Sequence, residues 1–118
     1  MKYFNISEFD SPDEIGSGAK HMKKNLLDSL DYARGVAGVP FKITSGYRTA
    51  KHNKDIHGSP TSSHLNGWAA DIYCDDVHVR EKILYGLVTA GFQRIGIAHN
   101  FIHCDVDPNK NPAVWLYS

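Results

Sequence analysis

The stretch Ser62-Ser63-His64-Leu65-Asn66-Gly67-Trp68-Ala69-Ala70-Asp71-Ile72-Tyr73 joins a polar loop to a short apolar segment. The loop, residues 47–67, carries glycine, proline, serine and threonine, whereas residues 68–73 have the composition of a strand. Side chains two residues apart in a strand share a face, so Asp71 lies on the face opposite Ala70 and Ile72. One face of this strand therefore presents a carboxylate, and the other packs on a core.

A second segment, residues 101–106, shows the same division between polar and apolar faces. Phe101, His103 and Asp105 share one face, and Ile102, Cys104 and Val106 share the other. If the two strands are neighbours, Asp71 and His103 converge, and His64 on the preceding loop completes a triangle. Two imidazoles and one carboxylate with a free position are the ligands of a catalytic zinc site. Spacing alone leaves a second interpretation open, because a strand histidine is more often an ordinary hydrogen-bonded side chain.

The remaining pattern predicts a single α+β domain over residues 1–118. Met22, Leu26, Leu30 and Ala33 recur at helical spacing and define the first long helix. The expected elements are an edge strand at 3–6, a helix at 20–37, a strand at 41–45, a short helix at 51–56, a strand at 68–73, a helix from Asp75 or Asp76 to Ala90, a hairpin of strands at 92–97 and 101–106, and a last apolar segment at 114–117. We expect a small antiparallel sheet with helices on one face and the zinc site on the other.

Composition narrows the function. The chain has 13 basic and 13 acidic residues among 118, and this balance disfavours nucleic acid as a partner. The longest apolar run, residues 83–88, is far shorter than the roughly 20 residues that span a bilayer, and residues 1–10 do not resemble a secretory signal. We therefore expect cytoplasmic synthesis, no membrane partner and a monomer. Seven histidines against two cysteines favour imidazole and carboxylate as metal ligands.

Three motifs together resemble a known family. They are Ser45-Gly46-Tyr47-Arg48, the stretch from Ser62 to Asp71, and Gly96 followed by Phe101-Ile102-His103-Cys104-Asp105 and Trp115. They resemble the zinc D-alanyl-D-alanine carboxypeptidase family of peptidases, called M15, and most closely its short phage and bacterial branch. The resemblance extends over most of the chain, from Tyr3-Phe4 to Trp115.

The resemblance implies a function and a set of site residues. It implies that His64, Asp71 and His103 bind one Zn²⁺, that Arg48 contacts the substrate or the developing oxyanion, and that Ser62 helps to hold the substrate. The implied reaction is hydrolysis of peptide bonds in peptidoglycan stem peptides, by a D,D-carboxypeptidase or by an endopeptidase such as a phage endolysin. A lysin of this kind reaches the cell wall through a separate membrane pore. A chain without a signal also fits a domain taken from a longer protein.

One departure from the family pattern concerns the general base. Many members carry an acidic residue three positions before the last zinc histidine, where this chain has Asn100. His99 and Asp105 are the local substitutes. Asp105 has an alternative role as a carboxylate that orients His103, and His99 as an exposed turn residue. If neither serves as base, the chain is a non-catalytic zinc-binding module of a cell wall or phage structure.

The sequence indicates other residues less strongly as parts of the site. Tyr47, Trp68 and Tyr73 are candidates for aromatic walls that hold a peptide, whereas Trp115 is expected in the core. The remaining histidines, His21, His52, His57 and His78, are expected at the surface. A non-haem iron site shares the same ligand types, but the Ser-x-His-x-x-Gly motif argues against it. Cys74 and Cys104 are expected to be buried free thiols, with a bridge between strands as the alternative.

Overall fold

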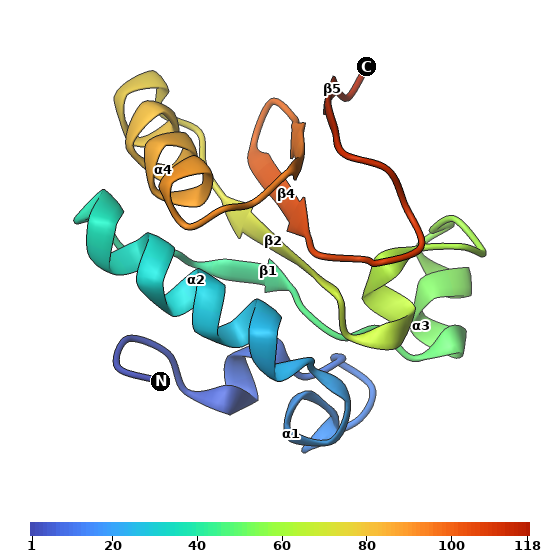
Figure 1. The fold of residues 1–118 in the computed structure, drawn as a ribbon. Helices are drawn as coiled ribbons and strands as arrows, with labels where there is room; N and C mark the ends of the chain where they lie inside the picture. Colours follow the sequence, from blue (N-terminus) through green and yellow to red (C-terminus); the bar gives the residue numbers. More distant parts are fainter.

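A five-stranded sheet forms the centre of the protein in the computed structural model, which describes residues 1–118 (Figure 1). The strands are β1 (Ile43–Ser45), β2 (Ala69–Tyr73), β3 (Arg94–Ile97), β4 (Phe101–Asp105) and β5 (Ala113–Leu116), in the order β1-β2-β4-β3-β5. The antiparallel pair of β2 and β4 lies in the middle of this order and aligns Asp71 directly with His103. The expected convergence of these two residues is confirmed.

Two long helices cover the apolar face of the sheet. They are α2 (Lys24–Ala37) and α4 (Val77–Thr89), which lie side by side in Figure 1. The Asp76 carboxylate begins α4 by accepting hydrogen bonds from the backbone N–H groups of His78 and Val79. None of the helices is both long and apolar enough to cross a bilayer.

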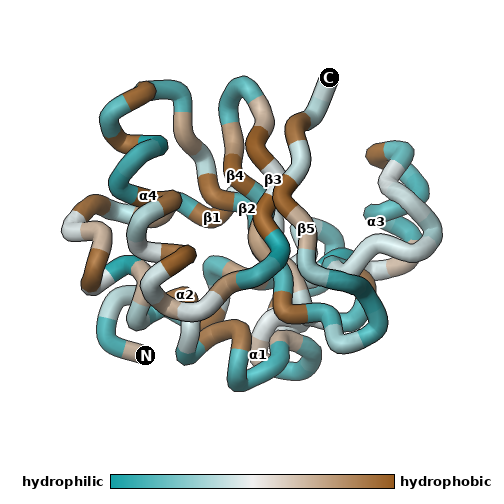
Figure 2. The backbone as a smooth tube through the Cα atoms, turned by 45° about the horizontal axis from the view of Figure 1, so that its top comes forward, coloured by the Kyte–Doolittle hydropathy of each residue, from teal (hydrophilic) through white to brown (hydrophobic).

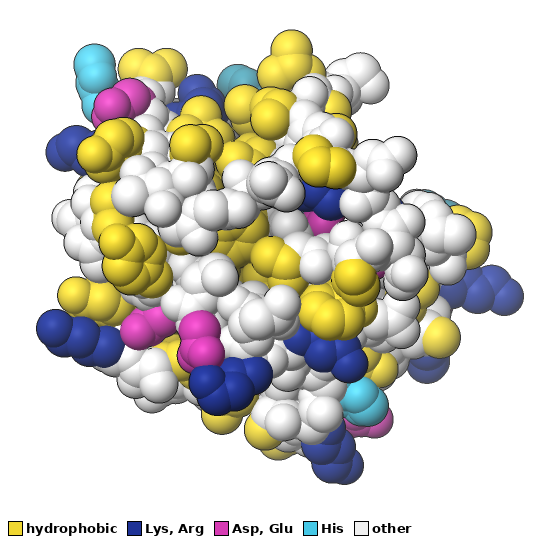
Figure 3. Space-filling model, viewed as in Figure 1, with side chains coloured by type: hydrophobic (Ala, Val, Ile, Leu, Met, Phe, Trp, Pro, Cys, Tyr) yellow, Lys and Arg dark blue, Asp and Glu magenta, His cyan; other side chains and the backbone are white.

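The core lies between these helices and the sheet. It contains the inward side chains of both layers: Leu26, Leu30, Ala33, Ile83 and Leu87 from the helices, and Ala70, Ile72, Ile95, Ile102 and Cys104 from the strands. Figure 2 shows hydrophobic residues along the central strands. On the surface shown in Figure 3, basic and acidic side chains are interspersed rather than separated into patches of one sign. Cys74 and Cys104 are both free and buried, as expected.

The N-terminal third differs from the prediction. Residues 3–6 form no strand, and a 3₁₀ turn at Ile6–Phe9 follows them. The expected helix at 20–37 is two helices, α1 (Ser17–His21) and α2, with extended backbone at Met22 and Lys23. The break has a tertiary cause, since the Lys23 N–H donates a hydrogen bond of 3.0 Å to the carbonyl of Gly67. The two short helices α3 (Ala50–Asp55) and η2 (Ser63–Asn66) lie in the loop between β1 and β2.

The sheet is mixed rather than wholly antiparallel. The last apolar segment is strand β5, and it pairs in parallel with β3, with Ala113 beside Arg94 and Trp115 beside Gly96. The chain leaves β4 beside Arg94, turns through residues 106–112 and runs back antiparallel to β4. Because β3 is also antiparallel to β4, β5 must be parallel to β3.

Replacing Gly86 by alanine should destabilise the protein. A Cβ at this position would collide with the carbonyl oxygen of Ala33 and lie 3.0 Å from the Ala37 Cβ, so α2 and α4 would have to separate. Overpacking of this kind costs about 1–3 kcal/mol, although alanine is the better helix former. Urea unfolding should therefore show a lower free energy of unfolding for Gly86→Ala.

The matched control is Gly35→Ala in α2, where a new Cβ would meet only the exposed Tyr3 ring, at 3.2 Å. This variant should be as stable as the unchanged protein or more stable. Equal stabilisation by both substitutions would contradict the close approach at Gly86.

Candidate metal centre

His64 is held rigidly at the end of the loop that precedes β2. The Ser62 hydroxyl accepts a hydrogen bond from the His64 N–H, and Gly67 ends the 3₁₀ turn with φ 77°. The imidazole is 2% exposed, and its Nδ1 lies 2.7 Å from the carbonyl oxygen of Gly46. A carbonyl only accepts, so Nδ1 carries the proton and Nε2 keeps its lone pair.

His103 is oriented in the opposite sense by Asp105. Its Nε2 lies 2.7 Å from Asp105 Oδ2, and its Nδ1 lies 2.9 Å from Asp71 Oδ1. The carboxylate of Asp105 accepts the proton of Nε2, which leaves the lone pair of Nδ1 directed at Asp71. His64 Nε2 approaches the same Asp71 oxygen, at 3.2 Å.

Three electron-pair donors therefore meet at one point. The ligand atoms of His64, Asp71 and His103 all lie within 4.8 Å of one another, and all three residues are buried. In the neutral tautomers both lone pairs face the Asp71 carboxylate, so a cation at this point would be bound by all three groups. Without a cation, a proton on an imidazole nitrogen takes this place and forms a hydrogen bond to Asp71. Two histidines and one carboxylate fit Zn²⁺, which keeps a fourth position open for water or substrate in catalytic sites. The hydrogen bonds that the two imidazoles donate to the Gly46 carbonyl and the Asp105 carboxylate are the outer contacts that orient such ligands.

The charges around this point are arranged for a cation. Burial alone would raise the pKa of Asp71, but hydrogen bonds from His103 and His64 hold it well below its usual range, so Asp71 is an anion. Burial lowers the pKa of His103, but the hydrogen bonds to Asp105 and Asp71 raise it above its ordinary value. Burial also raises the pKa of Asp105, and the His103 contact lowers it overall. Both carboxylates are ionised at neutral pH.

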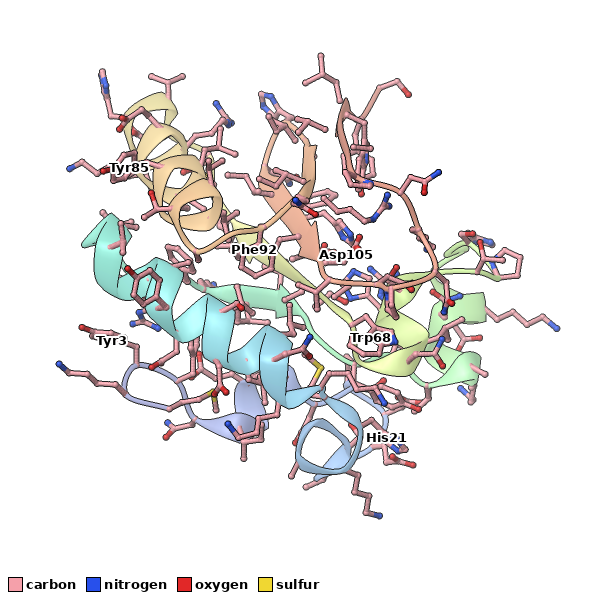
Figure 4. All side chains as sticks on the ribbon, in the orientation of Figure 1. Tyr3, His21, Trp68, Tyr85, Phe92 and Asp105 are labelled. Carbon is pink, nitrogen blue, oxygen red and sulfur yellow. The ribbon has the colours of Figure 1, made fainter.

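Both oxygens of Asp105 are engaged. Oδ2 contacts His103, and Oδ1 accepts from the guanidinium of Arg94 at 2.7 Å and from the Asp107 N–H at 3.2 Å. The side chain is 1% exposed, and Figure 4 shows it at the end of β4. Of the two roles considered from the sequence, this geometry fits a residue that orients His103 better than a base that receives a proton from water.

Arg48 lies on the other side of Asp71. Its guanidinium contacts Asp71 Oδ2 at 3.3 Å, the Ser45 hydroxyl at 2.9 Å and the Asn53 side-chain oxygen at 3.3 Å. Burial lowers the pKa of Arg48 and Asp71 raises it, and the group remains a cation because guanidinium is so weakly acidic. The three contacts hold a positive charge beside the metal ligands.

The candidate ligands form the floor of a cleft of about 300 Å³. Residues of the polar loop before His64 and several aromatic side chains contribute to its lining. The residues that line the cleft are Arg48, Gly58, Ser59, Ser62, Ser63, His64, Asp71, Arg94, Phe101, His103, Asp105, Lys110, Trp115 and Tyr117. The centre is thus open to a substrate from one side.

Apart from the three candidate metal ligands, three predicted site residues lie in the cleft and two do not. Arg48, Ser62 and Asp105 line it. Tyr47 lies outside it and stacks on His21, with ring centroids 4.3 Å apart. His99 is exposed on the turn between β3 and β4 and does not line the cleft.

The sequence analysis missed several lining residues. Trp115 was expected in the core, but its ring lies 5.5 Å from the His103 ring. Tyr117, Arg94 and Lys110 were not singled out at all. The alternation of a strand predicts that Trp115 and Tyr117 share a face. It does not predict that this face lies beside the site, because that depends on the parallel pairing of β5 with β3.

Comparison with known families agrees with this geometry. Residues 2–105 match the family described as Peptidase M15. The chain belongs to peptidase family M15. Family membership indicates a zinc-dependent metallopeptidase, and the buried His64, Asp71 and His103 are the residues that can hold the metal. A search of curated proteins finds no match. The M15 match ends at Asp105, so β5 with Trp115 lies beyond it.

His64→Ala and His103→Ala should each abolish stoichiometric zinc binding, because two remaining ligands cannot complete the site. His78→Ala, on the exposed surface of α4, is the matched control and should keep one zinc per chain. Elemental analysis of the dialysed proteins measures the ratio. Full zinc in either of the first two variants would remove that histidine from the ligand set.

Asp105→Asn should weaken zinc binding about 10–100-fold, because the amide cannot accept the Nε2 proton as strongly or hold the ring. A competition titration with a chromophoric chelator measures the affinity. Asp75→Asn, an exposed carboxylate bonded only to the Tyr73 hydroxyl, is the control and should leave the affinity unchanged. Equal affinities for the two variants would contradict the orienting role of Asp105.

Proposed function

We propose that this protein is a zinc peptidase that hydrolyses peptide bonds in peptidoglycan stem peptides, as a D,D-carboxypeptidase or an endopeptidase. The observation that carries the proposal is the convergence of His64, Asp71 and His103 on the floor of an open cleft in an M15 chain. A zinc peptidase needs three protein ligands that hold the metal and a fourth coordination position that water or substrate can reach.

The chemistry divides between the metal and the side chains. A bound Zn²⁺ makes hydroxide available near neutral pH and polarises the carbonyl group. Asp71 and the two histidines hold it, and Asp105 and the Gly46 carbonyl keep the imidazoles in the required tautomers. Arg48 stabilises negative charge next to Asp71, either on the peptide carbonyl oxygen or on a substrate carboxylate.

The charge of the cleft supports an acidic peptide as substrate. Arg48, Arg94 and Lys110 line it, against the two ionised carboxylates of Asp71 and Asp105. A bound divalent cation adds two further positive charges. Stem peptides carry free carboxylates, and a net positive cleft attracts them.

Ser62 and its neighbours provide the polar wall. The Ser63 hydroxyl contacts Asp107 at 2.7 Å and Lys110 at 2.9 Å, so the loop before His64 is tied to the segment before β5. Ser59 and Ser62 line the cleft on the same loop, and their hydroxyls can bond the backbone of an extended peptide.

A second candidate is a module that holds zinc without catalysis. It is favoured by the absence of a carboxylate in the cleft that is free to serve as base: Asp71 contacts both histidines and Arg48, and Asp105 is fully engaged. Asn100, at the position where relatives carry an acid, is exposed and does not line the cleft.

The setting we propose is that of a phage-encoded enzyme that acts as a monomer on the cell wall after release from the cytoplasm.

Digestion of purified peptidoglycan tests the function directly. Products should appear in mass spectra with the unchanged protein and with His78→Ala, and should be absent with His64→Ala or after addition of a chelator. Release of terminal D-alanine identifies a carboxypeptidase, and cleavage between earlier stem residues an endopeptidase. No chelator-sensitive product from several wall types would favour the non-catalytic module.

A further inference from the structure

Strand β5 and the residue after it bring two aromatic rings, Trp115 and Tyr117, to the cleft that holds the candidate metal ligands. Trp115 pairs with Gly96 of β3, and a Cβ on Gly96 would lie 2.6 Å from the Trp115 indole and 2.7 Å from Tyr117 Cε2. Only glycine therefore lets both rings settle on this face of the sheet. The Trp115 ring is 5.5 Å from the His103 ring and packs on the Arg94 guanidinium at 4.9 Å.

Tyr117 is held in position from three directions. Its N–H donates to the carbonyl of Ile97 at 3.0 Å. Its ring lies 5.1 Å from the Phe101 ring and 6.2 Å from the Trp115 ring. These three contacts fix the position of the Tyr117 ring and with it the place of its hydroxyl.

The hydroxyl itself is free to donate. Tyr117 lines the cleft and is 44% exposed, and its hydroxyl donates no hydrogen bond to an acceptor in the chain, unlike Tyr73, whose hydroxyl donates to Asp75. Burial raises the pKa of Tyr117, the Trp115 indole lowers it, and Asp71 raises it further. The phenol therefore keeps its proton at neutral pH, close enough to Asp71 and Arg48 to be influenced by both charges.

We propose that Tyr117 contacts the substrate and that its hydroxyl donates a hydrogen bond to the carbonyl oxygen of the peptide bond being hydrolysed. This inference rests on the proposed peptidase function. Arg48 and Tyr117, which both line the cleft, then both stabilise the negative charge that develops on that oxygen. The contact comes from a part of the chain that lies outside the M15 match.

The test compares Tyr117→Phe with Tyr85→Phe, both loaded with zinc to the level of the unchanged protein. Tyr85 is exposed on α4, away from the cleft, as Figure 4 shows. Acetohydroxamate is the probe, because it binds zinc as an anion whose oxygens stand in for the negative charge that develops on the carbonyl oxygen of a peptide. In isothermal titration calorimetry, Tyr117→Phe should bind it at least 10-fold more weakly, and Tyr85→Phe within twofold of the unchanged protein.

Two further outcomes separate this inference from the proposed function. With a peptide substrate, Tyr117→Phe should lower kcat about 10²-fold or more with KM nearly unchanged, since a donor to the developing charge acts mainly in the transition state. If the unchanged protein binds acetohydroxamate but cuts no wall peptide, the substrate class is wrong and the calorimetric comparison still decides the role of Tyr117. Acetohydroxamate affinity within twofold in Tyr117→Phe overturns the inference, and no zinc-dependent binding by any variant overturns both.

Discussion

The pairing of Asp71 with His103 across β2 and β4 is the constraint on which the site depends. The two residues are aligned in the antiparallel register, and the alternate residues Ala70, Ile72 and Cys104 are buried against the helices. A shift of one residue in either strand would turn a ligand into the core and a core residue into the cleft. The apolar packing of one face therefore fixes the chemistry of the other.

Contacts around the aligned residues determine which nitrogen of each histidine keeps its lone pair and which oxygen of Asp71 is left free for the metal. Gly46 and Asp105 each occupy one nitrogen of an imidazole, and Arg48 occupies the second oxygen of Asp71. Asp105 lies two residues from His103 on the same strand, whereas Gly46 and Arg48 come from the loop after β1, 18 and 23 residues from the side chains that they contact. The Asp71 carboxylate stays ionised although it is buried, because hydrogen bonds from the two imidazoles lower its pKa and the Arg48 guanidinium lies 3.3 Å from its second oxygen.

Strand alternation predicted on which face the central residues lie, whereas the pairing of the two strands was a condition of the argument and the ligand set came from the resemblance to M15. Alternation placed Asp71, His103 and Asp105 on one face and the apolar residues on the other, because the period of a strand does not depend on the rest of the fold. It failed where position depends on contacts between distant segments. The break at Lys23 is caused by the Gly67 carbonyl, and the place of Trp115 follows from the parallel pairing of β5 with β3. Neither interaction leaves a local pattern in the sequence.

The zinc site that we propose would hold one ion through Nε2 of His64, a carboxylate oxygen of Asp71 and Nδ1 of His103. Long-range ¹⁵N–¹H NMR correlation on zinc-loaded protein tests it directly, because protonated and metal-bound ring nitrogens differ in chemical shift. The account predicts a protonated Nδ1 and a metal-bound Nε2 for His64, and the reverse for His103. Binding of His103 through Nε2, or unchanged ring signals of either histidine on addition of zinc, would contradict it.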